Sequence, residues 1–194
     1  MRFGKGADEK TVRYFSNCFN DNPTSGHGTS TVFVERDHAL YPVACMGFGP
    51  RWKTMFKQEQ FKPLIPDGVD IDGPEHKNPF FFIWSDLNSD GNVQPPEVNF
   101  YKGVASGVTV LPDLSFCIAR MGADEKNCQT VRFKPVKFTA DGAPVYDFSM
   151  KEVLADRVEK SASSGGCQAL TDNDGNTIVT LGVSPFHQLS ISGT

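Results

Sequence analysis

Residues 31–46 read Thr-Val-Phe-Val-Glu-Arg-Asp-His-Ala-Leu-Tyr-Pro-Val-Ala-Cys-Met. Two runs rich in β-branched, aromatic and other apolar residues, 31–34 and 41–46, flank the polar segment 35–38. Short β-forming runs on either side of a polar segment are typical of a β-hairpin. This stretch therefore predicts two antiparallel strands joined by a surface turn, and the rest of the chain repeats the pattern.

The chain of 194 residues contains 18 glycines and 13 prolines, which fall between short apolar runs and do not gather in one linker. Asp-Gly pairs supply the positive φ that tight turns need, and five of them begin at Asp67, Asp72, Asp90, Asp141 and Asp174. Further strands are expected over 80–84, 108–111, 115–120, 130–133 and 177–181. The sequence predicts one all-β domain of three- or four-stranded antiparallel units, with helix in fewer than about a fifth of its residues.

Two segments are ambiguous between helix and strand. In residues 51–61, Trp52, Met55 and Phe56 share a helical face, whereas Trp52, Thr54 and Phe56 share a strand face. Glycines and prolines nearby favour the strand. A capping box at Ser149 and an apolar face that follows it leave open one short helix over 150–159.

Composition excludes several classes of protein. A formal net charge of −4 and a pI near 5.5 disfavour a nucleic-acid partner, because such binding depends on Lys and Arg that neutralise phosphates. No stretch approaches the roughly 20 apolar residues of a membrane span, and no apolar run follows residues 1–10 as in a signal peptide. The five cysteines are Cys18, Cys45, Cys117, Cys128 and Cys167. No two of them have C-x-x-C spacing, which argues against a zinc site.

Residues 86–97 match the twelve-residue calcium loop of an EF-hand position by position. Side-chain oxygens stand at positions 1, 3 and 5, Gly91 at position 6, an apolar residue at position 8 and Glu97 at position 12. Calcium takes six to eight oxygen ligands at about 2.3–2.6 Å, and a glycine lets the chain turn tightly around it. The sequence therefore predicts one Ca²⁺ held by Asp86, Asn88, Asp90, Asn92 through its carbonyl, Gln94 and Glu97. Glu97 would supply both carboxylate oxygens.

The flanks of this loop differ from those of a paired EF-hand. Residues 80–84 are continuously apolar, as in a buried strand, and Pro95 and Pro96 suit the first turn of a short helix. We therefore expect a strand, the loop, and then a short helix or turn, with 84–98 as an insertion in the domain. A second acidic segment, 172–176, has no glutamate at position 12 and is interpreted as a plain turn.

Candidate catalytic residues are not identified. His27 lies in a Gly- and Ser-rich connector, His38 follows Asp37 in the expected hairpin turn, and neither His76 nor His187 belongs to a metal-ligand motif. The chain has no nucleophile elbow, P-loop or dinucleotide fingerprint. Since no Ser-His-acid triad can be assembled from these patterns, the sequence leaves the catalytic residues unknown.

A short pattern occurs twice, more than a hundred residues apart. Residues 6–10 and 122–126 both read Gly-Ala-Asp-Glu-Lys, and each copy precedes a Thr-Val-Arg-aromatic run. Reuse of one charged turn by chance is one interpretation. The other is two hairpin-bearing units of common pattern, as in the blades of a repeat protein.

Residues 82–98 contain the pattern W-x-D-x-N-x-D-G-x-x-Q-x-x-E-V, and residues 133–147 read F-x-P-x-x-F-T-x-D-G-x-P-x-Y-D. The first resembles an insertion of large bacterial extracytoplasmic β-propeller proteins related to NHL-repeat propellers, and the second resembles the strand-turn-strand element downstream of it. The resemblance implies propeller blades and an exported parent, and it carries over no catalytic residue. Propellers of this kind usually run to several hundred residues, so residues 1–194 are expected to form one small β-propeller-like domain or a propeller segment.

Three functions are compatible with these features. The first is a calcium-stabilised binding or scaffold module, extracytoplasmic and with a glycan or another protein chain as partner. The second is a polysaccharide-directed hydrolase or lyase that uses carboxylates on the loop face. The third is a cell-surface structural subunit that self-associates through open sheet edges.

Overall fold

The computed structural model describes residues 2–5, 11–17, 28–156, 158, 169–172, 174 and 176–179. The chain is mostly β and its strands pair antiparallel in every sheet. The expected all-β class is confirmed. No helix in the described ranges has the length and apolar character needed to cross a membrane.

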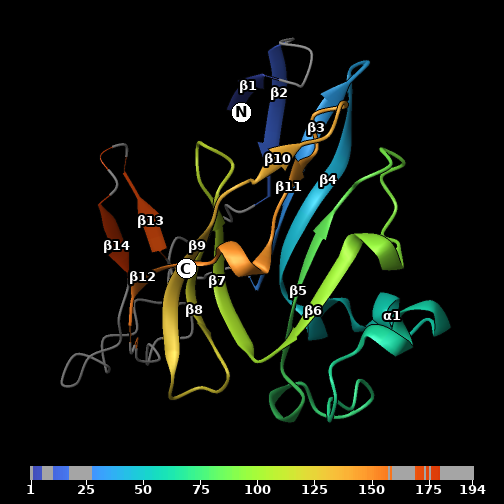
Figure 1. Ribbon diagram of the computed structural model, residues 1–194, viewed down its shortest axis with the longest axis vertical. Helices are drawn as coiled ribbons and strands as arrows, with labels where there is room; N and C mark the ends of the chain where they lie inside the picture. The colour runs from blue at the N-terminus through green and yellow to red at the C-terminus, as the bar shows by residue number, and fades with distance from the viewer. Residues whose placement is uncertain are drawn as a thin grey trace, which may run out of the picture.

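The larger sheet is a six-stranded meander in which every strand lies beside its neighbours in the chain (Figure 1). It is formed by β1 (Arg2–Lys5), β2 (Thr11–Ser16), β3 (Thr29–Arg36), β4 (Ala39–Phe48), β5 (Phe80–Ser85) and β6 (Val98–Lys102). The predicted β3–β4 hairpin is confirmed, and Asp37 and His38 in its turn both have positive φ. A bulge lies beside Pro42, where the missing N–H of proline is tolerated.

The second sheet has four strands in the order β12-β9-β8-β7. Its strands are β7 (Val104–Val110), β8 (Phe116–Gly122), β9 (Cys128–Phe133) and β12 (Glu152–Ala155). Two further hairpins are β10 (Lys137–Phe138) with β11 (Pro144–Val145), and β13 (Ala169–Thr171) with β14 (Thr177–Val179). The β10–β11 pair confirms the expected strand-turn-strand element within residues 133–147.

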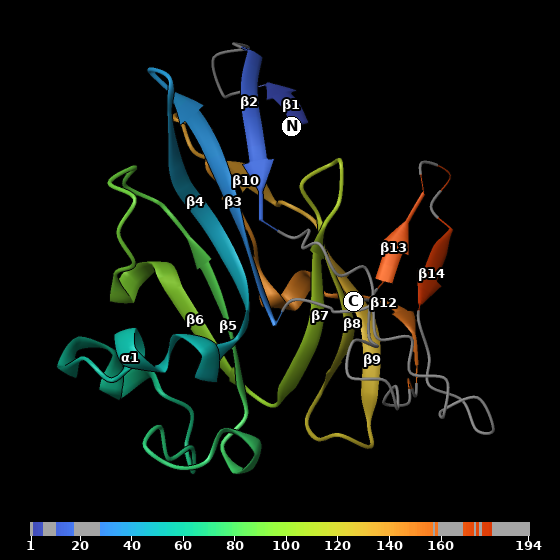
Figure 2. The same cartoon turned by 180° about the vertical axis from the view of Figure 1, so that it is seen from behind.

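The main core lies between the two sheets, which Figures 1 and 2 show side by side. Alternate residues of β5, Phe81 and Ile83, face this core together with residues of β7, β8 and β9. The Ser30 hydroxyl donates a hydrogen bond to the Val108 carbonyl at 2.7 Å and ties β3 to the edge of β7. The sheet β12-β9-β8-β7 has the three or four strands expected of each antiparallel unit, whereas the sheet β1–β6 has six strands and is larger than expected. Within the described ranges no sheet closes into a ring of blades.

The outer face of the six-stranded sheet is covered by a helical segment on the side away from β7–β9 (Figures 1 and 2). The segment consists of η1 (Gly49–Trp52), α1 (Lys53–Phe56) and η2 (Glu59–Leu64), and η3 (Glu75–Lys77) follows it. The expectation of a strand over 51–61 is therefore wrong. The aromatic rings on the outer face of β5 would be exposed to water without this segment. A helical turn places Trp52, Met55 and Phe56 on one side, where they pack against these rings.

The possible helix over 150–159 is also wrong. A single 3-10 turn, η5 (Phe148–Met150), is capped by the Asp147 carboxylate, which accepts from the Ser149 N–H at 2.8 Å. The chain then pairs with β9 as β12. Arg132 donates to both carboxylate oxygens of Glu152, at 3.0 and 2.9 Å, across this pair. Pairing with the free edge of β9 satisfies backbone groups that a short exposed helix would leave to water.

The repeated Gly-Ala-Asp-Glu-Lys pattern stands between paired antiparallel strands in both places. Residues 6–10 lie outside the described residues, but β1 and β2 on either side of them pair antiparallel. Residues 122–126 connect β8 to β9, which also pair antiparallel. The strands that flank each copy thus pair as the interpretation of two hairpin-bearing units expects.

Candidate functional site

The acidic loop connects β5 to β6 and begins where β5 leaves the sheet core. The Asp86 N–H donates to the Val43 carbonyl at 2.9 Å, which fixes the loop's first residue to β4. The loop ends in η4 (Pro95–Glu97), a 3-10 turn with proline at its start. The expected order of strand, loop and short helical turn is confirmed.

Asp86 at loop position 1 is fully buried. Its Oδ1 accepts a hydrogen bond from the Ser89 N–H at 2.7 Å, and its Oδ2 accepts from the Gly91 N–H at 3.1 Å. Gly91 has φ +70°, the left-handed conformation that glycine adopts readily. The carboxylate therefore holds the tight part of the loop around itself, and position 6 needs the glycine that the motif supplies.

Glu97 at position 12 closes the loop from its other end. Its Oε1 accepts from the N–H groups of Leu87 and Asn88 at 2.8 and 3.3 Å, and its Oε2 accepts from the Trp84 indole N–H at 3.2 Å. The side chain is almost completely buried. Both ends of the loop are thus joined through one carboxylate, which the Trp84 ring orients.

The polar side chains at positions 3, 5 and 9 meet one another. The Asn88 amide NH₂ donates to Asp90 Oδ2 at 3.2 Å and to Gln94 Oε1 at 3.3 Å. Gln94 also donates to Asp90 Oδ2. The Asn92 N–H donates to Asp90 Oδ1 at 2.7 Å, and the Asn92 side chain donates to the Asp90 carbonyl. The Asp90 carboxylate is thus stabilised by hydrogen bonds from neutral amide N–H groups.

Negative charge in this loop is not balanced by an ion pair. None of Asp86, Asp90 and Glu97 forms a salt bridge with a cationic side chain in the part of the chain that the structure describes. The Arg36 guanidinium reaches the loop only at the Ser89 carbonyl, at 3.4 Å. Buried carboxylates without a cation are costly unless hydrogen bonds or a metal compensate them.

The loop's donor set fits a hard cation such as calcium. All of its candidate side-chain ligands offer oxygen, three of them as carboxylates, and two of those carboxylates are buried. Within the described ranges, His, Cys, Asp and Glu side chains form no group of three or more that could hold a metal ion. Asn88 and Gln94 are not of those four types. The structure brings Asn88, Asp90 and Gln94 into contact, while Asp86 and Glu97 bond to the loop backbone.

The sequence also draws attention to four histidines and a second acidic segment. The His38 side chain is 96% exposed, with Nδ1 3.9 Å from Glu35 Oε1. His76 lies in η3 on the surface, and His27 and His187 lie outside the described residues. Asp172 accepts from the N–H groups of Asp174 and Asn176 at 3.0 and 2.8 Å, which confirms a turn between β13 and β14.

Three of the cysteines, Cys45, Cys117 and Cys128, are buried thiols, and Cys18 and Cys167 lie outside the described residues. Burial raises the pKa of the Cys45 thiol to about 12, although a hydrogen bond from the Thr31 hydroxyl opposes this effect. A thiol with so high a pKa is a poor nucleophile. Cys45 is therefore part of the packing beneath the aromatic rings of β5.

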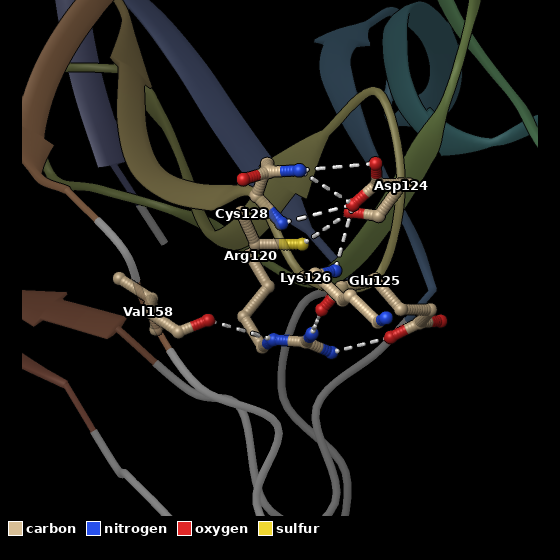
Figure 3. A network of polar contacts seen from close by, with 7 residues as sticks. Arg120, Asp124, Glu125, Lys126, Cys128 and Val158 are labelled. Carbon is tan, nitrogen blue, oxygen red and sulfur yellow. Dashed lines mark hydrogen bonds and ion pairs between the residues drawn. The ribbon is translucent and has the colours of Figure 1, made fainter.

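A polar network around the second copy of the charged pattern fixes the β8–β9 turn (Figure 3). The buried Arg120 donates to the Glu125 side chain at 3.0 Å, to the Glu125 carbonyl at 2.8 Å and to the Val158 carbonyl at 3.4 Å. Hydrogen bonds from the N–H of Lys126 and from Asn127 lower the pKa of the Asp124 carboxyl. This network holds the β8–β9 turn together and joins it to the backbone at Val158.

Two contacts of the loop have no local sequence signal. Trp84 was part of the motif, but only the fold shows that its indole reaches Glu97. Arg36 lies 53 positions before Ser89 and also donates to the Asp141 carbonyl in the β10–β11 turn at 3.2 Å. Long-range contacts of this kind depend on how β3, β5 and β10 are brought together.

Comparisons of this chain with protein-family models, with curated proteins and with solved structures give no match. The interpretation of the site therefore depends on its own residues and geometry.

Proposed function

We propose that residues 86–97 bind one calcium ion and that the chain is a calcium-stabilised β-module with a binding or scaffold role. The observation that carries the proposal is the pair of buried carboxylates, Asp86 and Glu97, which lie at the two ends of one loop without a cationic partner in the described chain. A divalent cation between them would compensate their charge. Both oxygens of Asp86 and Oε2 of Glu97 each accept one hydrogen bond and keep a second lone pair, whereas Oε1 of Glu97 accepts two and would have to give up one of them to bind the ion.

The expected ligands follow the positions of the loop. Asp86, Asn88 and Asp90 would each contribute a side-chain oxygen, Asn92 its carbonyl, Gln94 a direct or water-mediated contact, and Glu97 both carboxylate oxygens. Calcium supplies a compact double positive charge and accepts irregular coordination by six to eight oxygens. Mg²⁺ is a poorer fit because it demands near-octahedral geometry and dehydrates reluctantly.

The expected affinity is at the weak end of the EF-hand range, about 10⁻⁵–10⁻³ M. Three carboxylates attract the ion, but the loop has a strand before it and a single 3-10 turn after it in place of two long helices. Such an affinity suits a calcium-rich extracellular fluid, which supports the proposed extracytoplasmic location. The ion would tie the ends of β5 and β6 together and so stabilise the sheet that carries any partner-binding face.

The partner and the larger architecture belong to the same proposal. The antiparallel sheet β12-β9-β8-β7 has the four strands of a propeller blade, which supports the propeller interpretation. The strands β6 and β12 stand at the ends of their sheets. An added strand from another protein chain, or from a second copy, could pair there. We propose a glycan or protein partner, and no observation favours a hydrolase.

Thermal melting of the full chain tests the proposal. At free calcium a hundredfold above the dissociation constant, binding only to the folded state adds about 2.7 kcal/mol to the free energy of unfolding. For a chain of this size the melting temperature should then rise by roughly 5–11 °C relative to chelator. Magnesium at the same concentration should give a much smaller rise.

A matched pair of variants places the effect in the loop. Asp90→Asn and Asp174→Asn each remove one exposed carboxylate from an Asp-Gly turn. Asp90→Asn should lose much of the calcium-dependent rise, whereas Asp174→Asn should keep it. An equal melting temperature of the wild type in calcium and in chelator would overturn the proposal.

A further inference from the structure

Arg36 stands at the meeting point of three elements beside the acidic loop. Its Nη1 lies 3.4 Å from the Ser89 carbonyl in the loop, and its Nη2 lies 3.2 Å from the Asp141 carbonyl in the β10–β11 turn. Its guanidinium carbon lies 5.7 Å from the centroid of the Tyr41 ring. One permanent positive charge is thus fixed next to a loop that is proposed to bind a cation.

The position of this charge is determined by contacts outside the loop. The Tyr41 ring attracts the guanidinium through a cation–π interaction, and the Asp141 carbonyl accepts from its other amino group. The turn that contains Asp141 is itself held, because the Tyr14 hydroxyl donates to the Gly142 carbonyl at 2.7 Å. Arg36 therefore cannot leave the loop without losing contacts on two other elements.

The contact with Ser89 is close to the first loop ligand. The Ser89 N–H donates to Asp86 Oδ1 at 2.7 Å, so Arg36 touches the residue that orients the buried carboxylate. A guanidinium there compensates part of the loop's negative charge when no metal is bound. A bound divalent cation would be repelled by the same guanidinium, since like charges repel more strongly through partly desolvated protein than through water.

We propose that Arg36 sets the affinity of the loop for calcium, with its guanidinium opposing the ion and keeping binding weak. This inference rests on the proposed calcium site and names the residue that regulates it. The hairpin β10–β11 and Tyr41 act as the support that keeps the charge in place. The arrangement would let the loop respond to calcium at high concentration and remain without metal at low concentration.

Calorimetric titration of the full chain with calcium chloride tests this role, with two substitutions that separate charge from shape. Arg36→Gln removes the charge and keeps a hydrogen-bond donor, and it should bind calcium about three- to tenfold more tightly than the wild type. Arg36→Lys keeps the charge and should bind within about twofold of the wild type. The ratio between Arg36→Gln and the wild type should shrink toward one in high salt, because salt screens the repulsion.

A second pair of variants tests the support. Tyr41→Phe keeps the aromatic ring and should leave calcium affinity unchanged, whereas Tyr41→Ala frees the guanidinium and should tighten binding by less than Arg36→Gln does. Melting in chelator shows that each variant is folded.

The outcomes distinguish this inference from the proposed function. A wild type that releases no binding heat with calcium would defeat the calcium site itself. A wild type that binds calcium, with Arg36→Gln equal to it or weaker, would leave the site standing and overturn the role of Arg36. A gain in affinity that is the same in low and high salt would also overturn it, because a purely structural change does not depend on screening.

Discussion

Replacing Glu97 by glutamine should destabilise the protein in two separable ways. The carboxylate is almost completely buried and accepts three hydrogen bonds, from the N–H groups of Leu87 and Asn88 and from the Trp84 indole. Glutamine has a single acceptor oxygen, so its NH₂ group must point either at the N–H groups of Leu87 and Asn88 or at the Trp84 indole N–H, and the donors on that side lose their acceptor. Without calcium, we expect Glu97→Gln to lower the free energy of unfolding by about 1–3 kcal/mol, which is the cost of leaving a buried donor unsatisfied.

With calcium the loss should be larger, because the bidentate ligand of the ion is also removed. The wild type gains about 2.7 kcal/mol at a hundredfold excess of free calcium over the dissociation constant. The difference between wild type and Glu97→Gln should therefore grow to about 4–6 kcal/mol in calcium. Urea denaturation followed by tryptophan emission, in calcium and in chelator, measures both differences.

Glu59→Gln is the matched control, since the Glu59 side chain is 87% exposed and pairs only with Lys62 among the described contacts. It should leave both unfolding curves unchanged. If Glu97→Gln loses the same free energy in chelator as in calcium, Glu97 is no calcium ligand and the reasoning fails.

Three further predictions concern the fold. Burial raises the pKa of Cys45 from 9.0 and of Tyr14 from 10.0, each to about 12. The contribution of these two groups to the free energy of unfolding should therefore be constant below about pH 9 and be lost between pH 9 and 12. Urea denaturation at a series of pH values in this range should show a shallower fall for Tyr14→Phe than for the wild type. Phe56→Ala should lower the free energy of unfolding, measured by urea denaturation, by about 3–5 kcal/mol, because the fully buried ring contacts four other phenylalanines. A smaller decrease would mean that the helical segment η1–α1–η2 is loosely packed on the sheet. Gly142→Ala should lower the free energy of unfolding by about 1–2 kcal/mol, because Gly142 has φ +85° and a Cβ would lie 3.1 Å from the Tyr14 hydroxyl. An unchanged midpoint of urea denaturation would show that alanine is not strained at this position.

Local patterns were enough to predict the hairpins. The turn at Asp37 and His38, the acidic turn after β13 and the strand-turn-strand element of β10 and β11 all depend on neighbouring residues, and all were confirmed. The order of elements around the loop was also predictable, because a buried apolar run and two prolines mark its ends.

The helical cover and β12 were not predictable from local patterns. Residues 53–56 are helical because the outer face of β5 needs a cover, and residues 152–155 form a strand because the edge of β9 is free and Arg132 binds Glu152. Arg36 was missed for the same reason. Its contacts are with Ser89 and Asp141, which lie 53 and 105 positions away in the chain.

Terbium luminescence tests the calcium loop most directly, because Tb³⁺ occupies oxygen-rich calcium sites and emits when a nearby tryptophan is excited. The Trp84 indole N–H lies 3.2 Å from Glu97 Oε2, so an ion held by Glu97 would lie close to this ring. The proposed site predicts sensitised emission that saturates at one ion per chain, falls when calcium is added, and is lost in Glu97→Gln. Emission that is absent in the wild type, or that neither calcium nor Glu97→Gln reduces, would show that the loop does not hold calcium.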